Sequence, residues 1–120
     1  MLVDGYNVAK LGWPALTLAE QRERTIATAE DVARRWGTDL TIVFDGADVP
    51  GASAPARRLV RVVYSPAGVL ADDVLRAEVD QLDHRRAVVV VTSDQAVVND
   101  VRTAGANTIA SDQFLAVARR

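Results

Sequence analysis

The chain has 120 residues, of which 49% are hydrophobic, and a formal net charge of -2 at pH 7. A chain of this length can bury roughly two-thirds of its unfolded surface, so we expect a single domain over residues 1–120. Such a small net charge excludes bulk attraction to a polyanion, which would have to bind at a local basic patch. The sequence has no Cys, which excludes disulfides and thiolate metal sites and favours a reducing, cytoplasmic location.

Membrane and secretory segments are not predicted. No basic segment leads into an apolar stretch at the N-terminus, and the longest clean apolar run, Ala87 to Val91, is far too short to cross a bilayer. We therefore expect no membrane partner.

The first half of the chain alternates between strand and helix patterns. A strand of Met1 to Val3 ends on Asp4, and its shortness indicates a domain cut from a longer chain. After Asn7 we expect a loop that contains Gly12-Trp13-Pro14. Thr17-Leu18-Ala19-Glu20 is a capping box, which predicts a helix start. The apolar side of this helix is predicted to run from Leu18 to Trp36, with Gly37 as its end.

The middle of the chain continues this alternation. Leu40–Phe44 is a predicted strand that ends on Asp45-Gly46, and the residues from there to Leu59 are too broken and polar for regular structure. Val60–Tyr64 is a third strand, expected near an edge of the sheet. Asp72 or Asp73 is then expected to cap a helix that buries Leu75, Val79 and Leu82.

The last third supplies two more strand and helix pairs. Val88–Val91 is all valine, which predicts a parallel strand covered on both faces near the sheet centre. Ser93 and Asp94 begin a helix that ends near Gly105, Thr108-Ile109 forms a short strand, and Ser111 caps a final helix. The whole pattern predicts an α/β protein, a three-layer α/β/α sandwich around a mostly parallel sheet.

Apolar segments of this chain repeatedly end on acid, at Asp4, Asp45, Asp72-Asp73 and Asp94. Ligands of an open parallel sheet bind outside the carboxyl ends of its strands, where we expect these side chains to gather. Each Asp taken alone is better explained as a turn or helix-cap residue. Caps alone do not require an acid at nearly every strand end, because Ser, Thr and Asn also cap helices. The set therefore favours a metal site.

Carboxylates in this arrangement suit a particular chemistry. Mg²⁺ and Mn²⁺ prefer oxygen ligands, and such ions can activate water for phosphodiester hydrolysis without a nucleophilic side chain. The residue content of the chain agrees with this chemistry. The chain has no Cys, no nucleophile elbow and no Walker loop, and its only His, His84, lies in a predicted loop, so triad hydrolases and P-loop enzymes fit poorly.

Several segments together resemble a known family. Asp4-Gly5-Tyr6-Asn7-Val8, Val43-Phe44-Asp45-Gly46, Val62-Val63-Tyr64-Ser65 with Ala71-Asp72-Asp73, and Thr92-Ser93-Asp94 look like the NYN domain, in its YacP-like branch of the PIN-like nuclease superfamily. The resemblance spans nearly the whole chain. It implies a parallel sheet of order 3-2-1-4-5 and a divalent-metal endoribonuclease. Relatives carry a longer first strand than this chain.

The resemblance also implies roles for individual residues. Asp4 would be the principal metal ligand, and Asn7 would orient Asp4 or the substrate. Asp72 and Asp94 would bind the metal directly or through water. Asp73 is a further metal ligand candidate at a position that varies among relatives, and Asp45 is similar to the acid of the FDG step in related 5′-nucleases.

Arginines and one tryptophan are candidates to contact RNA. Arg57, Arg58 and Arg61 cluster beside the long loop and could bind phosphates, or could simply be solvated. Trp13 could stack on a base or pack against the protein, whereas Trp36 is expected in the core. A ribosome or other protein partner and the oligomeric state are left open.

Two other classes of protein also fit parts of the pattern. Receiver domains and phosphoaspartate hydrolases gather Asp at the same sheet edge. Both classes also need a Lys late in the chain, near the phosphoryl site, whereas the only Lys here is Lys10. A non-catalytic PIN-like module that binds RNA or protein is the second alternative. A dead site has no reason to keep mutually repelling carboxylates, which favours the nuclease.

Overall fold

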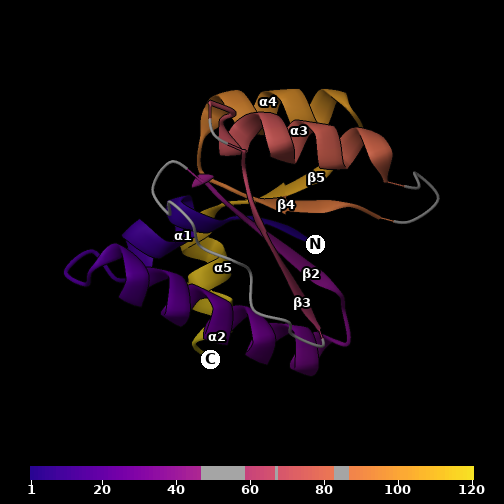
Figure 1. Cartoon of the computed structure of the whole chain (residues 1–120). Coiled ribbons are helices and arrows are strands. Elements are labelled where there is room, and N and C mark those ends of the chain that lie inside the picture. The colour runs from indigo at the N-terminus through magenta and orange to yellow at the C-terminus, as the bar shows by residue number, and fades with distance from the viewer. Residues whose placement is uncertain (47–58, 67, 83–86) are drawn as a thin grey trace.

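The structure is a computed structural model that describes residues 1–46, 59–66, 68–82 and 87–120 (Figure 1). Most of the expected long loop before Leu59 lies outside the described residues, as do Arg57, Arg58 and His84.

A parallel sheet of five strands forms the middle of the molecule, in the order β3-β2-β1-β4-β5. Every neighbouring pair is parallel, which confirms both the expected strand order and the edge position of the third strand. The strands are β1 (Leu2–Asp4), β2 (Leu40–Phe44), β3 (Val60–Tyr64), β4 (Val89–Val91) and β5 (Asn107–Ile109).

Helices cover both faces of this sheet, which confirms the three-layer sandwich. In Figure 1, α3 and α4 lie on one face, and α1, α2 and α5 lie on the other. The helices are α1 (Gly5–Gly12), α2 (Leu18–Trp36), α3 (Ala71–Gln81), α4 (Gln95–Thr103) and α5 (Ser111–Ala118). In the part of the chain that the structure describes, no helix is long and apolar enough to cross a membrane.

The core has two halves because side chains alternate across the strands. Val3 and Val91 pack with α1, α2 and α5 on one face, whereas Leu2 and Val90 pack with α3 and α4 on the other. All four are buried. The short central strands thus hold the two helical layers together and fix where the strand ends lie.

The helix α1 was not expected, because a loop containing Gly12-Trp13-Pro14 was predicted after Asn7. Packing explains why a glycine begins this helix. A Cβ on Gly5 would overlap the Phe44 ring and would lie 2.9 Å from the Val43 carbonyl oxygen. Only glycine lets the chain turn from β1 into α1 this close to β2. As a result, the residues after Asp4 form one helical face instead of a loop.

The helix α2 begins and ends as expected. Thr17 and Glu20 form the predicted capping box, and Gly37 ends the helix in the left-handed conformation, with φ of 62°. The expectation that Trp36 is a core residue is wrong. Its exposed fraction is 41%, since it is the last residue of the helix and the buried stripe ends at Ala33.

Smaller differences concern helix ends. Leu70 occupies the N-cap position of α3, so Asp72 and Asp73 lie in the first turn, where their charge favourably meets the helix dipole. Leu82 ends that helix with an exposed fraction of 37%. Ala110, and not Ser111, occupies the N-cap position of α5.

Candidate active site

A pocket of about 370 Å³ opens at the carboxyl edge of the sheet. Its walls come from the ends of β1 and β2 and from the first turns of α1 and α3, together with the start of α4. The residues that line it are Asp4, Tyr6, Asn7, Lys10, Asp45, Leu70, Ala71, Asp72 and Asp94. The structure therefore brings together the predicted acids Asp4, Asp45, Asp72 and Asp94, and it adds Lys10.

Asp4 is the last residue of the central strand and the most buried of these acids, with an exposed fraction of 7%. Strand register places it, because Val3 pairs with Val91 and the next residue on each strand therefore lies side by side. The hydroxyl of Thr92 donates a hydrogen bond of 2.9 Å to Asp4 Oδ2. Neighbouring strands thus hold this carboxylate in a fixed orientation.

The environment of Asp4 disfavours its charge. Burial raises the pKa of Asp4 to about 6, the hydrogen bond from Thr92 opposes that rise, and the charges of Asp72 and Asp94 add to it. Burial likewise raises the pKa of Asp72, and the charge of Asp94 is the next contribution. These carboxylates therefore lie close enough to repel one another, as a convergent site requires.

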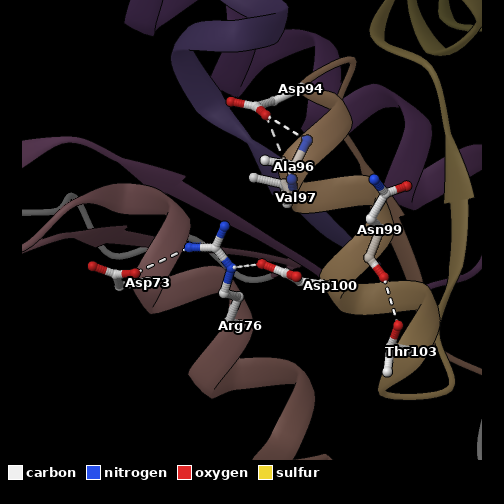
Figure 2. Close-up of polar contacts among 8 residues, drawn as sticks. All are labelled: Asp73, Arg76, Asp94, Ala96, Val97, Asn99, Asp100 and Thr103. Atoms are coloured by element: carbon white, nitrogen blue, oxygen red, sulfur yellow. Dashed lines mark hydrogen bonds and ion pairs between the residues drawn. The ribbon is translucent and has the colours of Figure 1, made fainter.

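Asp94 both caps a helix and lines the pocket. Its Oδ1 accepts hydrogen bonds from the backbone amides of Ala96 at 3.0 Å and Val97 at 3.4 Å, so it caps α4 (Figure 2). Figure 2 shows the other carboxylate oxygen pointing away from the helix. A residue that caps a helix at a sheet edge can thus also present an oxygen to the pocket.

The neighbouring acids of α3 point in different directions. Asp72 lines the pocket, whereas Asp73 forms an ion pair of 3.0 Å with Arg76, one turn along the helix. Arg76 also contacts Asp100 of α4 at 2.6 Å, and Figure 2 shows this arginine between the two acids. The structure therefore separates Asp73 from the pocket acids and places it in a link between α3 and α4.

Asn7 lies on the pocket wall, but its side-chain oxygen is used inside the protein. Oδ1 accepts one hydrogen bond from the Ser93 amide at 2.9 Å and another from Ser111 Oγ at 2.5 Å. Ser111 is fully buried. Asn7 thereby joins α1 to the segment after β4 and to the start of α5.

Asp45 directly follows β2, at the edge of the sheet where the neighbouring strand β3 also ends. A Cβ on Gly46 would overlap the Ser65 carbonyl oxygen, and the Gly46 amide donates to Ser65 Oγ at 3.0 Å. This close approach makes glycine necessary after Asp45 and holds the carboxylate at the pocket. The charge of Asp45 is one of the contributions that raise the pKa of Asp72.

Lys10 and Thr92 were not predicted as site residues. Lys10 lies one turn after Tyr6 on α1, so both reach the pocket from the same helical face. Predicting that helix would have identified Lys10, but Gly5 and Gly12 concealed it. Thr92 directly precedes Ser93-Asp94 in the sequence, but its place beside Asp4 follows from strand register, which the sequence alone does not supply.

Of the predicted RNA-contacting residues, Arg57 and Arg58 lie outside the described residues, and Arg61 and Trp13 do not line this pocket. Arg61 pairs with Glu78 at 3.1 Å and lines a separate pocket of about 660 Å³, which Met1 and Gly37 also line. Trp13 packs against the core, with the Arg119 guanidinium 5.5 Å from the centre of its ring.

The pocket offers the donor atoms that a hard divalent cation prefers. Among the described residues, no three acidic or histidine side chains lie close enough to form a ready-made metal cluster. Mg²⁺, however, is commonly held by one or two carboxylates, with waters and substrate phosphate completing its shell. The oxygen-only donor set of Asp4, Asp72 and Asp94 fits that requirement, and a bound positive charge would offset the burial and repulsion that raise the pKa values of Asp4 and Asp72.

The fold is PIN-like, and two crystal structures of Rae1 (YacP) from Bacillus subtilis share it. One, of a mutant, has a TM-score of 0.83 at 20% identity and covers 98% of this chain and 73% of that one. The other has a TM-score of 0.83 at 23% identity and covers 98% of this chain and 72% of that one.

The particular family follows from the sequence as a whole. Residues 1–120 match the YacP-like NYN domain, and the chain belongs to that family, one of nuclease domains. A search of curated proteins finds no match.

Proposed function

We propose that this domain is a divalent-metal-dependent endoribonuclease that hydrolyses RNA phosphodiester bonds at the acidic pocket, with Mg²⁺ or Mn²⁺ as its cofactor. The convergence of Asp4, Asp72 and Asp94 on one pocket carries the proposal, together with the raised pKa values of Asp4 and Asp72. Membership of a nuclease domain family supports it. We further propose that residues 1–120 act as one domain in the cytoplasm.

Each acid has its own part in the proposed site. Asp4 is the principal ligand, and Thr92 keeps its carboxylate charged and oriented. Asp72 and Asp94 would hold the ion directly or through water, and Asp45 adds negative charge to the pocket. A bound divalent ion supplies an activated water and stabilises the leaving oxygen.

Buried acids with raised pKa values explain why such a site would need its cation. Without metal, the pocket favours a protonated Asp4 below a pH of about 6. Binding a cation requires the carboxylate form, so metal binding and proton release are coupled. We therefore propose that the residues of the pocket are assembled for a cation and a phosphate together.

A non-catalytic module that binds RNA or protein is the alternative. The clustered acids favour the nuclease over the binding module, since a surface that only binds RNA gains nothing from carboxylates that repel phosphate.

A cleavage assay tests the proposal. The purified domain is incubated with linear and circular single-stranded RNAs and with structured RNAs, in Mn²⁺, Mg²⁺ or EDTA. We expect metal-dependent cutting of the circular RNA, which an exonuclease cannot attack, and we expect Asp4→Asn to abolish it. Equal traces of cleavage by wild type and variant would identify contamination, and binding without cleavage would support the binding module.

A further inference from the structure

Lys10 is the only lysine of the chain, and it lies on the wall of an otherwise acidic pocket. The same pocket is lined by Asp4, Asp45, Asp72 and Asp94. A cation in that position would be expected to pair with one of these acids. Yet in the part of the chain that the structure describes, its ammonium forms no ion pair with any pocket carboxylate.

The Lys10 ammonium is instead placed by an aromatic ring. Lys10 Nζ lies 5.4 Å from the centre of the Tyr6 ring. That ring is itself fixed, because Tyr6 is buried, its hydroxyl accepts a hydrogen bond of 3.0 Å from Arg22, and its centre lies 5.0 Å from that of Phe44. A cation held over a ring keeps those of its N–H donors that face away from the ring available to a ligand.

Electrostatics indicates what such a cation would bind. An RNA phosphate that approaches this pocket meets several carboxylates, and repulsion would oppose its entry. A positive charge on the wall offsets part of that repulsion and can donate to a phosphate oxygen. An ammonium suits this purpose, because it contacts phosphate as a compact point charge.

We propose that Lys10 is a positioning residue that donates a hydrogen bond to a non-bridging oxygen of the RNA phosphate held across the acidic pocket. This inference rests on the proposed function, because it takes RNA as the ligand. Lys10 lies on α1, the helix that directly follows Asp4, so this helix would supply the phosphate contact.

The test measures RNA binding without metal or cleavage. In an Asp4→Asn background with EDTA, the affinity for one short single-stranded RNA is measured over a range of salt concentrations. Adding Lys10→Gln should lower the slope of log affinity against log salt by about 0.7, the contribution of one phosphate contact to a single strand. Such a difference in slope means that the variant's loss of affinity relative to its parent is about fivefold larger in 0.1 M salt than in 1 M salt.

Matched variants separate charge from structure. Lys10→Met keeps the aliphatic stem over Tyr6 and should behave as Lys10→Gln does, whereas Lys10→Arg should retain the slope. Arg24→Gln removes one positive charge from an exposed position on α2 and should leave the slope unchanged. In the metal-loaded enzyme, Lys10→Gln should raise KM more than it lowers kcat, because the phosphate carries its charge before the reaction begins.

The outcomes distinguish this inference from the proposed function. If the wild type cleaves RNA but Lys10→Gln and Lys10→Met keep the parent slope, the inference fails and the nuclease remains. If the slope falls as expected but no metal gives cleavage, the phosphate contact is supported and the nuclease proposal fails. If the Asp4→Asn protein does not bind RNA at all, the inference is overturned.

Discussion

The Thr92 hydroxyl and the Asp4 carboxylate, 88 residues apart in the chain, form a hydrogen bond of 2.9 Å at the carboxyl edge of the sheet. The same hydroxyl oxygen accepts a hydrogen bond of 3.1 Å from the Asp94 amide. One buried side chain therefore fixes the positions of two acids on neighbouring parts of the pocket. Parallel register, which aligns Val3 with Val91, makes this link possible.

Replacing Thr92 with Val should move the pH dependence of cleavage. The hydrogen bond from Thr92 lowers the pKa of Asp4, so its loss raises that pKa further. Because the metal ligand must be deprotonated, the rise of kcat/KM with pH should shift to higher pH. We expect a loss of about tenfold near pH 6 that shrinks at higher pH.

The control for this variant is Thr92→Ser, which keeps the hydroxyl and should keep the wild-type profile. The measurement is kcat/KM as a function of pH at saturating Mn²⁺. A uniform loss at every pH would show that Thr92→Val acts through misplacement of the site and not through the ionisation of Asp4.

Asp4→Asn should stabilise the metal-free protein near neutral pH. The pKa of Asp4 is about 6 in the folded state, above its ordinary value of 3.8, so the folded state binds more protons than the unfolded state between these values. Stability is therefore lost as pH rises through this window, because ionising Asp4 costs more in the folded protein. Removing the charge should recover roughly 1–3 kcal/mol above pH 6.

Thermal melts of wild type and Asp4→Asn in EDTA, across pH values on both sides of this window, test that expectation. The difference between the two proteins should be full above pH 6 and should vanish as pH falls below 3.8, where Asp4 becomes protonated in both states. A difference independent of pH would show that repulsion and burial of the charge are not its cause.

The sequence predicted the sheet and the acidic edge because both depend on short-range patterns. Valine-rich segments that end on Asp predict parallel strands, and parallel strands bring Asp4 and Asp94 to the same edge wherever the loops run. These patterns do not predict in which direction each side chain of a helix turn points. Asp72 and Asp73 are adjacent in sequence, and the structure turns one toward the pocket and the other toward Arg76.

The remaining gaps come from packing between distant segments. Glycine has a low helix propensity, which gives no local signal for a helix at Gly5, but the nearby Phe44 ring requires a glycine at the start of α1. Because α1 was not predicted, the helical face that places Lys10 beside the acids was also not predicted. The link from Asn7 to Ser111 spans 104 residues and has no local signal.

Two substitutions at Asp94 should separate its cap from its proposed metal contact. Asn caps helices about as well as Asp, so Asp94→Asn should keep the metal-free stability or raise it. Asp94→Ala should lose about 1 kcal/mol, since the Ala96 and Val97 amides lose their acceptor. Both variants should show a smaller gain in stability from Mn²⁺, which in wild type reaches about 2.7 kcal/mol at a hundredfold excess over Kd.

Melting curves of the three proteins with EDTA and with Mn²⁺ measure both effects at once. A full Mn²⁺ gain in Asp94→Asn would restrict Asp94 to the helix cap. Wild type indifferent to Mn²⁺ would remove the acidic pocket as a metal site.

Asn7 is the last residue whose two proposed roles can be separated by experiment. Asn7→Ala removes the acceptor of the Ser93 amide and of the buried Ser111 hydroxyl, which should cost about 2–3 kcal/mol of unfolding free energy in urea titrations. Ser111→Ala removes one donor and leaves Asn7 in place, so it should cost less. The double variant should lose less than the sum, because the partners share one interaction.

Cleavage by the same proteins, measured at a temperature where each is fully folded, tests whether Asn7 also orients Asp4 or the substrate. If it does, Asn7→Ala should lose activity while Ser111→Ala retains it, since only the first removes a side chain that lines the pocket. Equal and small losses in both variants would leave Asn7 with a structural role. That result would follow from its Oδ1 being used between α1 and α5, and it would leave the acids and Lys10 as the groups that face the RNA.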